Sequence, residues 1–157
     1  MSSRAPAQVR SATRDDVDAI GRLLHDFNTE FEEPAPDPPA IADRMRELMA
    51  GDDFAVLLAG YGPDGLAVLR FRPSIWSTAL ECYLAELYVV PDRRGNGLGR
   101  ALMDRALTLA RDLGADYVDL GTSETDTAAR ALYESLGFTN REGSPDGPTM
   151  LYYEREL

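Results

Sequence analysis

ECYLAELYVVPDRRGNGLGRALMDRALTLAR, residues Glu81–Arg111, is the stretch that decides the fold. It begins with a mostly apolar run, passes Pro91 and a basic glycine-rich turn, and continues with apolar residues at the three-to-four spacing of one helix face. These apolar residues are Leu98, Leu102, Ala106 and Leu109, and the same spacing continues to Leu113 just beyond the stretch. The stretch therefore predicts a buried strand, a turn and a long amphipathic helix.

The turn, Arg94–Arg100, lies where the predicted helix begins. A helix N-terminus presents unpaired backbone N–H groups and the positive end of the helix dipole. Glycines let the backbone approach a ligand without Cβ clashes, and arginines add positive charge. The turn is therefore predicted to hold an anion, and a phosphate suits it best.

Two common phosphate motifs do not fit this turn. The P-loop needs four residues between its glycines and then Lys-Ser/Thr, and the turn has neither. The dinucleotide pattern G-x-G-x-x-G, begun at Gly95, would need glycine where the chain has Arg100, which argues against a nucleotide-binding fold. The pattern that does match is R-x-x-G-x-G, formed by Arg94, Gly97 and Gly99.

This loop resembles the coenzyme A pyrophosphate loop of the GNAT acetyltransferase superfamily. A second motif follows at the expected distance, because Ala128–Phe138 (AARALYESLGF) is similar to the family's A-x-x-L-Y-E-x-L-G-F helix. The resemblance covers residues 8–157 and implies acetyl-CoA as cosubstrate. The coenzyme contacts that it implies come from Leu87, Tyr88, Val89, Arg94, Gly95, Asn96, Gly97, Leu98, Gly99, Arg100 and Asp126, the first three through their backbone.

Tyr133 matches the family's general acid. A phenol with a pKa of about 10 stays protonated at neutral pH and can give its proton to a departing thiolate. The alternative is a core role, because Ala129, Leu132, Tyr133 and Leu136 form a helical stripe. The family pattern favours catalysis.

Glu86 is the candidate base. It is the only charged residue within Cys82–Val90, and an unpaired carboxylate among apolar neighbours is costly unless it reaches a pocket or has a partner elsewhere. Burial would raise its pKa toward the range useful for a base. Some family members carry a glutamate where this chain has Gly121, so that base is absent, and the family's coenzyme-binding asparagine is replaced by Asp126.

Two segments bear on the acceptor. Residues 29–39 form a proline-rich loop whose acids, Glu30, Glu32, Glu33 and Asp37, are either a solvated connector or an acidic rim that attracts a cationic amine. Trp76 either lines an acceptor pocket or covers the sheet edge, and the second is favoured.

The function predicted is N-acetylation of a primary amine by direct attack on the thioester, the acceptor being a cationic small molecule or a peptide amine. The alternative is a non-catalytic acyl-CoA-binding regulatory module.

Composition narrows the class of protein. A net charge of −11 argues against nucleic acid as partner, and the sequence holds no apolar run of membrane-spanning length. One cysteine fits a reducing, cytoplasmic setting without disulfides. One histidine and one cysteine argue against a metal site. The sequence is compatible with a homodimer.

The order of predicted elements is strand, two helices, three strands, helix, strand, helix and two strands. This order predicts one α/β domain over residues 8–157, after a flexible tail of residues 1–7, with a central mixed, mostly antiparallel sheet of about six to seven strands and about four helices. The last two strands are expected at Thr139–Arg141 and Met150–Glu156.

Overall fold

The computed structural model describes residues 8–157, so the expected tail, residues 1–7, lies outside the described residues. The chain divides into two compact units that meet in sequence at Leu120 and Gly121. The first unit contains the sheet and three α-helices, and the second contains one α-helix and the C-terminal segment. Each unit is described by itself.

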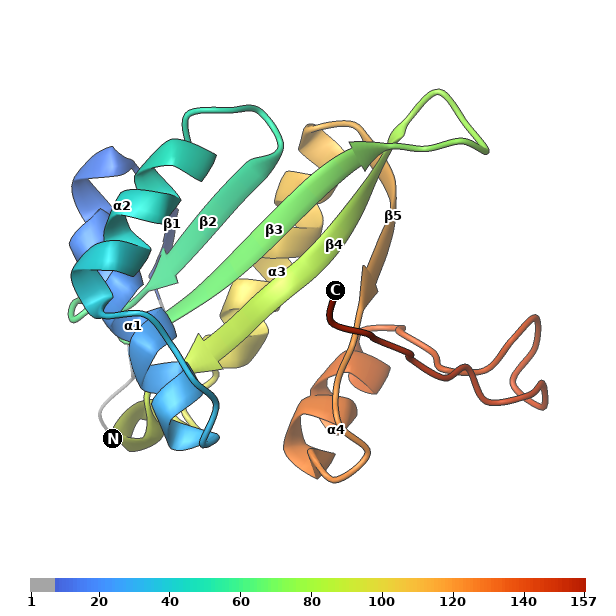
Figure 1. Cartoon of the computed structure of the whole chain (residues 1–157). Coiled ribbons are helices and arrows are strands. Elements are labelled where there is room, and N and C mark those ends of the chain that lie inside the picture. The colour runs from blue at the N-terminus through green and yellow to red at the C-terminus, as the bar shows by residue number, and fades with distance from the viewer. Residues whose placement is uncertain (1–7) are drawn as a thin grey trace. The chain divides into compact units, whose positions relative to one another are not determined.

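The sheet of the first unit has five strands in the order in which they occur in the sequence (Figure 1). They are β1 (Val9–Ser11), β2 (Phe54–Ala59), β3 (Gly65–Pro73), β4 (Leu80–Val89) and β5 (Ala115–Leu120). The first three pairings are antiparallel and the β4–β5 pairing is parallel. The predicted mixed, mostly antiparallel sheet is confirmed, with five strands in the described chain instead of about six to seven.

Helices cover both faces of the sheet. Figure 1 shows α1 (Val17–Glu30) and α2 (Pro38–Leu48) on one face and α3 (Leu98–Asp112) on the other. Side chains alternate along a strand, so the even-numbered positions of β2 and β3 face α1 and α2. The core on that side includes Val56, Leu58, Leu66, Val68, Ile20, Leu23 and Met45. The odd-numbered positions of the same strands face α3.

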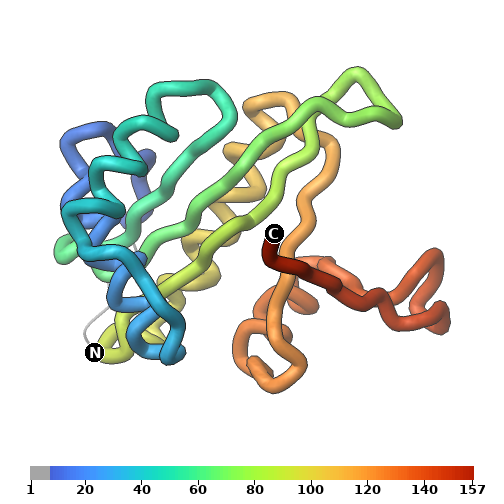
Figure 2. The backbone as a smooth tube through the Cα atoms, viewed as in Figure 1, coloured from blue at the N-terminus to red at the C-terminus, as the bar shows by residue number. Residues whose placement is uncertain are grey.

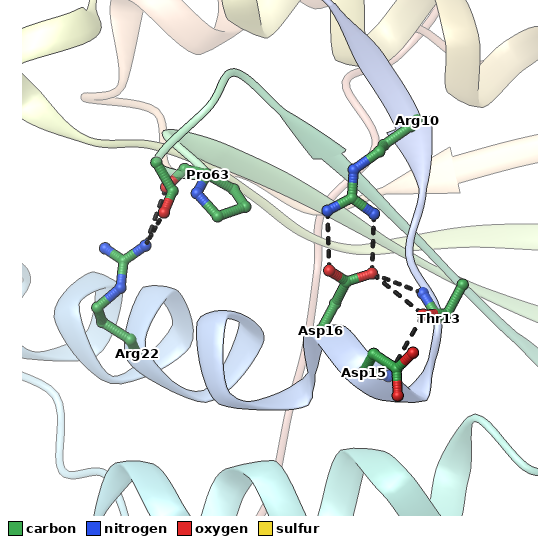
Figure 3. A network of polar contacts seen from close by, with 7 residues as sticks. Arg10, Thr13, Asp15, Asp16, Arg22 and Pro63 are labelled. Carbon is green, nitrogen blue, oxygen red and sulfur yellow. Dashed lines mark hydrogen bonds and ion pairs between the residues drawn. The ribbon is translucent and has the colours of Figure 1, made fainter.

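The chain enters α1 through a polar network (Figure 3). A capping box is present, because the Thr13 N–H donates to the Asp16 carboxylate at 2.8 Å while the Thr13 hydroxyl accepts from the Asp15 N–H at 3.3 Å. Arg10 of β1 binds the same carboxylate with two hydrogen bonds of 2.8 Å, which lowers the pKa of Asp16 to about 2. Further along α1, Arg22 donates to the carbonyl of Pro63 at 3.0 Å. These bonds fix α1 against the β1 and β2–β3 segments.

The second unit differs from the prediction. Helix α4 (Thr127–Ser135) begins at Asp126, whose carboxylate accepts from the Ala129 N–H at 3.1 Å. The prediction of two strands at residues 139–141 and 150–156 is wrong. The described chain has one isolated bridge there, which pairs Arg141 with Thr149. The turn between them closes with a bond from the Glu142 N–H to the Pro148 carbonyl. A turn-rich connection with one bridge does not supply the ladder that an extended strand pair needs.

The hairpin between β3 and β4 is long, and Figure 2 shows its turn, residues 74–79, projecting past the end of the sheet. Trp76 lies in this turn with 88% of its surface exposed, so the favoured expectation that it covers the sheet edge is wrong. A polar turn stabilised by its own serines, such as Ser74 accepting from the Trp76 N–H, leaves the indole in solvent. Among residues 8–157, no helix is long and apolar enough to cross a membrane.

The contact between α1 and α2 generates a stability prediction. A Cβ at Gly21 would lie 2.5 Å from the carbonyl oxygen of Pro38 and 3.2 Å from the nitrogen of Ala42, so the helices must separate to accept it. We expect Gly21→Ala to lower the free energy of unfolding by about 1–3 kcal/mol, as overpacking does, although the same change in an uncrowded helix stabilises by about 1 kcal/mol. Urea unfolding measures this difference.

Thr108→Ala, on an exposed position of α3, is the control, because it raises helix propensity without a clash. Its unfolding midpoint should stay near that of the wild type. An unchanged or higher midpoint for Gly21→Ala would show that α1 and α2 separate at no cost.

Candidate functional site

The glycine-rich turn has the geometry that a phosphate site requires. A short 3-10 turn, Pro91–Arg93, is followed by Gly95 with φ of 78° and Gly97 with φ of 81°, both in the left-handed region that L side chains avoid. Gly97 is the residue before α3, and its carbonyl accepts the first helical bond, from the Ala101 N–H at 3.0 Å. A Cβ at Gly95 or Gly97 would meet no atom within 4 Å, so the space above this backbone is open.

The other turn residues lie as follows. The Asn96 side chain donates to the Arg93 carbonyl at 3.1 Å, which closes the turn. Leu98 is buried and anchors α3 to the core, while Gly99 and Arg100 lie in the first turn of the helix, with Arg100 exposed. The backbone N–H groups of a first helical turn point out of the helix end. The structure thus places the turn and the start of α3 as the sequence predicts.

Arg94 points toward helix α1. One of its terminal nitrogens donates to both carboxylate oxygens of Glu30 at 2.8 Å, and its Nε donates to the Val89 carbonyl at 2.9 Å. The guanidinium also lies 5.6 Å from the ring centre of Tyr88, whose hydroxyl donates to Glu30 at 3.3 Å. Arg94 therefore fastens the end of β4 to the end of α1. The guanidinium expected at a phosphate is engaged with a carboxylate in this structure.

Strand β4 extends beyond its parallel neighbour. Pairing with β5 begins at Leu80 and ends where Leu84 lies opposite Leu120, while pairing with β3 continues to Val89. The Val90 N–H donates to Asp64, at the β3 side, at 2.8 Å. Because backbone groups alternate along a strand, those of Leu87 and Val89 point to the opposite edge, which carries no partner strand within residues 8–120. The backbone of Tyr88 faces β3, and its side chain is buried beside Phe27.

Glu86 is half-buried on the face of the sheet that carries α1 and α2. Its carboxylate makes no hydrogen bond or ion pair within residues 8–157. Burial raises the pKa of Glu86, and the positive charge of Arg70 acts in the opposite direction. A raised pKa is the direction of shift that a carboxylate acting as a general base requires.

A β-bulge directs Glu86 to that face. Val68 pairs with Glu86 and Leu69 pairs with Leu84, so Ala85 is an extra residue in β4. The extra residue shifts the alternation, so that Glu86 and Tyr83 share one face although an unbroken strand would place them on opposite faces. The nearly continuous apolar run of β4 gave no sequence signal for the bulge.

Tyr133 and Asp126 belong to the second unit. Tyr133 is buried and packs edge-on against Phe138, with ring centres 5.9 Å apart. Burial, and after it the charge of Asp126, raises the pKa of Tyr133 to about 12, so the phenol is protonated at neutral pH. The Asp126 carboxylate caps α4, a role that its acceptor-only chemistry suits.

Sequence reasoning missed three charged or polar side chains near Glu86 on the same face: Arg70, Arg72 and Tyr83. The pairings of Arg70 with Tyr83 and of Arg72 with Glu81 put these side chains in one row. Side-chain alternation along β3 places both arginines on the face opposite the odd-numbered positions. It could not indicate which partner on β4 each would meet, because that depends on the bulge.

Comparison with known proteins identifies the class. The profile of the acetyltransferase (GNAT) family matches residues 20–138, so the chain belongs to this family. GNAT acetyltransferases use acetyl-CoA as cosubstrate.

Three relatives illustrate the range of the family. The crystal structure of a provisionally assigned acetyltransferase of Arthrobacter sp. FB24 is 45% identical, covers 100% of this chain and 99% of its own, and has a TM-score of 0.88. A thialysine N-epsilon-acetyltransferase of Caenorhabditis elegans is 24% identical over 135 residues, 85% of this chain and 83% of that one. A mycothiol acetyltransferase of Beutenbergia cavernae is 45% identical over 69 residues, 42% of this chain and 23% of that one, so this chain spans less than a quarter of it.

The open turn generates a binding prediction. We expect Gly97→Val to abolish binding of coenzyme A, because a branched side chain at φ of 81° fills the space above the backbone where a pyrophosphate would lie. Calorimetry with coenzyme A on the folded variant gives the measurement.

Gly114→Val is a matched control. Gly114 follows the other end of α3, has φ of 95°, and would also direct a Cβ into open space, so the backbone strain is similar. Its affinity for coenzyme A should equal that of the wild type. If a folded Gly97→Val protein binds coenzyme A as the wild type does, the turn is not the pyrophosphate site.

Proposed function

We propose that this protein is an acetyl-CoA-dependent N-acetyltransferase that transfers the acetyl group to a primary amine by direct attack on the thioester. The observation that carries the proposal is the position of β4. Its unpaired edge leads into the glycine-rich turn, and Glu86 projects from the same strand three residues before Val89. One strand thus supplies groups for both substrates.

The coenzyme is held by backbone groups in this proposal. The turn at Gly95–Gly97 and the first N–H groups of α3 bind the pyrophosphate, because they combine open space with the positive end of the helix dipole. The backbone of Leu87 and the N–H of Val89 face the unpaired edge, where they can bind the pantetheine amides and stabilise the oxyanion of the tetrahedral intermediate, while the Val89 carbonyl is bound by Arg94.

Glu86 acts as general base and Tyr133 as general acid. Glu86 accepts a proton from the ammonium, directly or through water, which frees the lone pair of the nitrogen to attack the thioester carbonyl carbon. The second proton that the nitrogen loses as the amide forms passes to solvent. Collapse of the tetrahedral intermediate breaks the carbon–sulfur bond and releases the thiolate of coenzyme A. Tyr133, protonated at neutral pH, gives its proton to this thiolate.

The acceptor is a cationic amine in its resting form, since a primary amine has a pKa of about 10. Glu32, Glu33 and Asp37 are exposed in the segment between α1 and α2 and supply negative charge. Glu30, predicted as part of the same rim, is instead paired with Arg94. Two relatives named as a thialysine N-epsilon-acetyltransferase and a mycothiol acetyltransferase support acetyl transfer as the reaction.

Turnover tests the proposal. A screen of thiol release from acetyl-CoA with polyamines, aminoglycosides, amino acids and peptide N-termini should find at least one amine that is acetylated. For that amine, Tyr133→Phe should lower kcat by about 10²–10⁴-fold, the range of one acid–base group, with little change in acetyl-CoA affinity. Wild-type turnover in the Phe variant would show that Tyr133 is a core residue without a catalytic role. The absence of thiol release with every amine would favour a non-catalytic acyl-CoA-binding module.

Glu86→Gln separates the catalytic and the structural effect of the carboxylate. We expect kcat/KM to fall by about 10²–10⁴-fold and to lose the rise with pH that titration of the base causes. Because burial raises the pKa of Glu86 in the folded protein, the wild type binds more protons when folded, and its stability falls as the pH rises through that pKa. The Gln variant should therefore be more stable than the wild type at pH 7.

This stability gain should disappear below the ordinary glutamate value of 4.5, where the carboxyl is protonated in the folded and the unfolded chain alike. Thermal unfolding at both pH values measures it. Equal stability at pH 7 would show that the carboxylate is not desolvated, and an unchanged pH–rate profile would assign the base elsewhere.

A further inference from the structure

An open pocket of about 200 Å³ lies on strands β3 and β4, outside the turn and the unpaired edge. It is lined by Arg70, Phe71, Arg72 and Tyr83. Arg70 and Arg72 are exposed and stand two positions apart on β3, so they point to the same face of the sheet. The pocket is therefore walled by two cationic side chains and one phenol.

The two arginines differ in how their charge is compensated. Arg72 donates through Nε to Glu81 at 2.7 Å. Arg70 has no ion pair within residues 8–157, and its guanidinium lies over the Phe54 ring, 4.8 Å from the ring centre. A guanidinium stacked on an aromatic face keeps its N–H edge available and is held in one orientation, which favours binding of a planar carboxylate.

The pocket lies on the same face as the proposed base. Val68 pairs with Glu86 and Arg70 pairs with Tyr83, and the bulge at Ala85 keeps both pairs on one side of the sheet. Two residues along a strand are about 6–7 Å apart, which small bifunctional molecules can span. The charge of Arg70 already acts on Glu86, so the two groups share one electrostatic environment.

We propose that this pocket binds a carboxylate of the acceptor, so that the substrate is a small amine that also carries a carboxylate. Arg70 holds the carboxylate, with Arg72 and Tyr83 beside it, and the amine is presented to Glu86. The inference rests on the proposed function and narrows its acceptor from any cationic amine to a zwitterionic one. The transfer step is unchanged, and the carboxylate takes part in binding alone.

The contact has a distinct kinetic signature. A carboxylate remote from the reacting atoms is bound equally in the ground state and the transition state, so losing the contact should raise KM and leave kcat nearly unchanged for the same acceptor. A loss of folding or of the base would instead lower kcat. Comparing the change in KM with the change in kcat therefore shows whether Arg70 recognises the acceptor or has a structural role.

The experiment compares each amino acid with the amine that lacks its carboxylate. Initial rates of thiol release are measured for L-lysine and cadaverine, and for L-methionine and its amide, with wild type, Arg70→Gln and Arg70→Lys. In the wild type, kcat/KM should be at least about tenfold higher for the member with the carboxylate, the size of one charge-assisted hydrogen-bond pair. Arg70→Gln should reduce this ratio to near one through KM, and Arg70→Lys should restore part of it.

Arg44→Gln is the matched control. Arg44 is an exposed arginine on α2, paired with Glu47, so the variant removes the same charge away from the pocket. In this variant, the ratio of kcat/KM between the acceptor with the carboxylate and the one without it should equal the ratio in the wild type. A ratio near one in the wild type, or an equal ratio in wild type and Arg70→Gln, would overturn the proposal.

A dipeptide arm identifies the source of the carboxylate. The amidated dipeptides Ala-Asp and Ala-Asn differ in one side-chain carboxylate. A preference for Ala-Asp that Arg70→Gln removes would assign the carboxylate to a peptide side chain, and a preference seen with the single amino acids alone would assign it to a free amino acid. Both outcomes support the pocket as a carboxylate site.

A binding arm keeps the test independent of turnover. The Nε–H signal of Arg70 is identified in nitrogen-15 NMR spectra by its loss in Arg70→Gln. It should shift on addition of N-acetyl-L-methionine and stay in place with the corresponding amide. If no amine releases thiol but this shift occurs, the proposed function fails and the carboxylate site stands; if the signal does not respond, the site fails.

Discussion

The unpaired edge of β4 is the constraint on which the other features depend. From Ala85 to Val89 the strand keeps β3 as its partner on one side and has no partner strand on the other within residues 8–120. Unpaired backbone groups are costly unless a ligand or water binds them. The pairing with β3, the buried Tyr88 and the Arg94 bond to the Val89 carbonyl hold this segment extended without a second strand. These contacts fix the edge in the extended conformation that preorganised binding of a ligand would require.

The bulge at Ala85 determines how strongly the carboxylate of Glu86 is desolvated. A regular strand would place Glu86 on the same face as the buried Leu84, where a carboxylate would be desolvated far more than it is. The bulge moves it to the other face, half-buried beside the charge of Arg70, where its proton affinity is raised without a fixed partner. Such a group destabilises the fold at neutral pH, and its retention is understandable if it serves the chemistry.

Local patterns allowed most of the fold to be predicted from the sequence. Helix periodicity located α3, and the glycine-rich pattern located the turn before it, where Gly97 adopts a left-handed backbone. Contacts between distant residues were not predictable: Glu30 and Arg94 are 64 positions apart, and no local pattern joins them. The bulge left no trace in an apolar strand, and the C-terminal strands were predicted from residue types that form one bridge instead of a ladder. The roles of Tyr133 and Glu86 rest on the family pattern and on burial, which a spacing argument cannot supply.

The distribution of charge explains why net charge alone is a poor guide to the acceptor. The chain carries −11 overall, which favours the approach of cations over long distances. In salt at physiological strength, however, charges act over about 8 Å, so a bound group responds to the side chains that it touches. On the face beside Glu86 those side chains include Arg70 and Arg72, whereas Glu32, Glu33 and Asp37 lie on the segment between α1 and α2. Under the proposed function, the overall charge draws an amine toward the protein while Arg70 binds an anionic group on the same molecule, and a zwitterionic acceptor satisfies both.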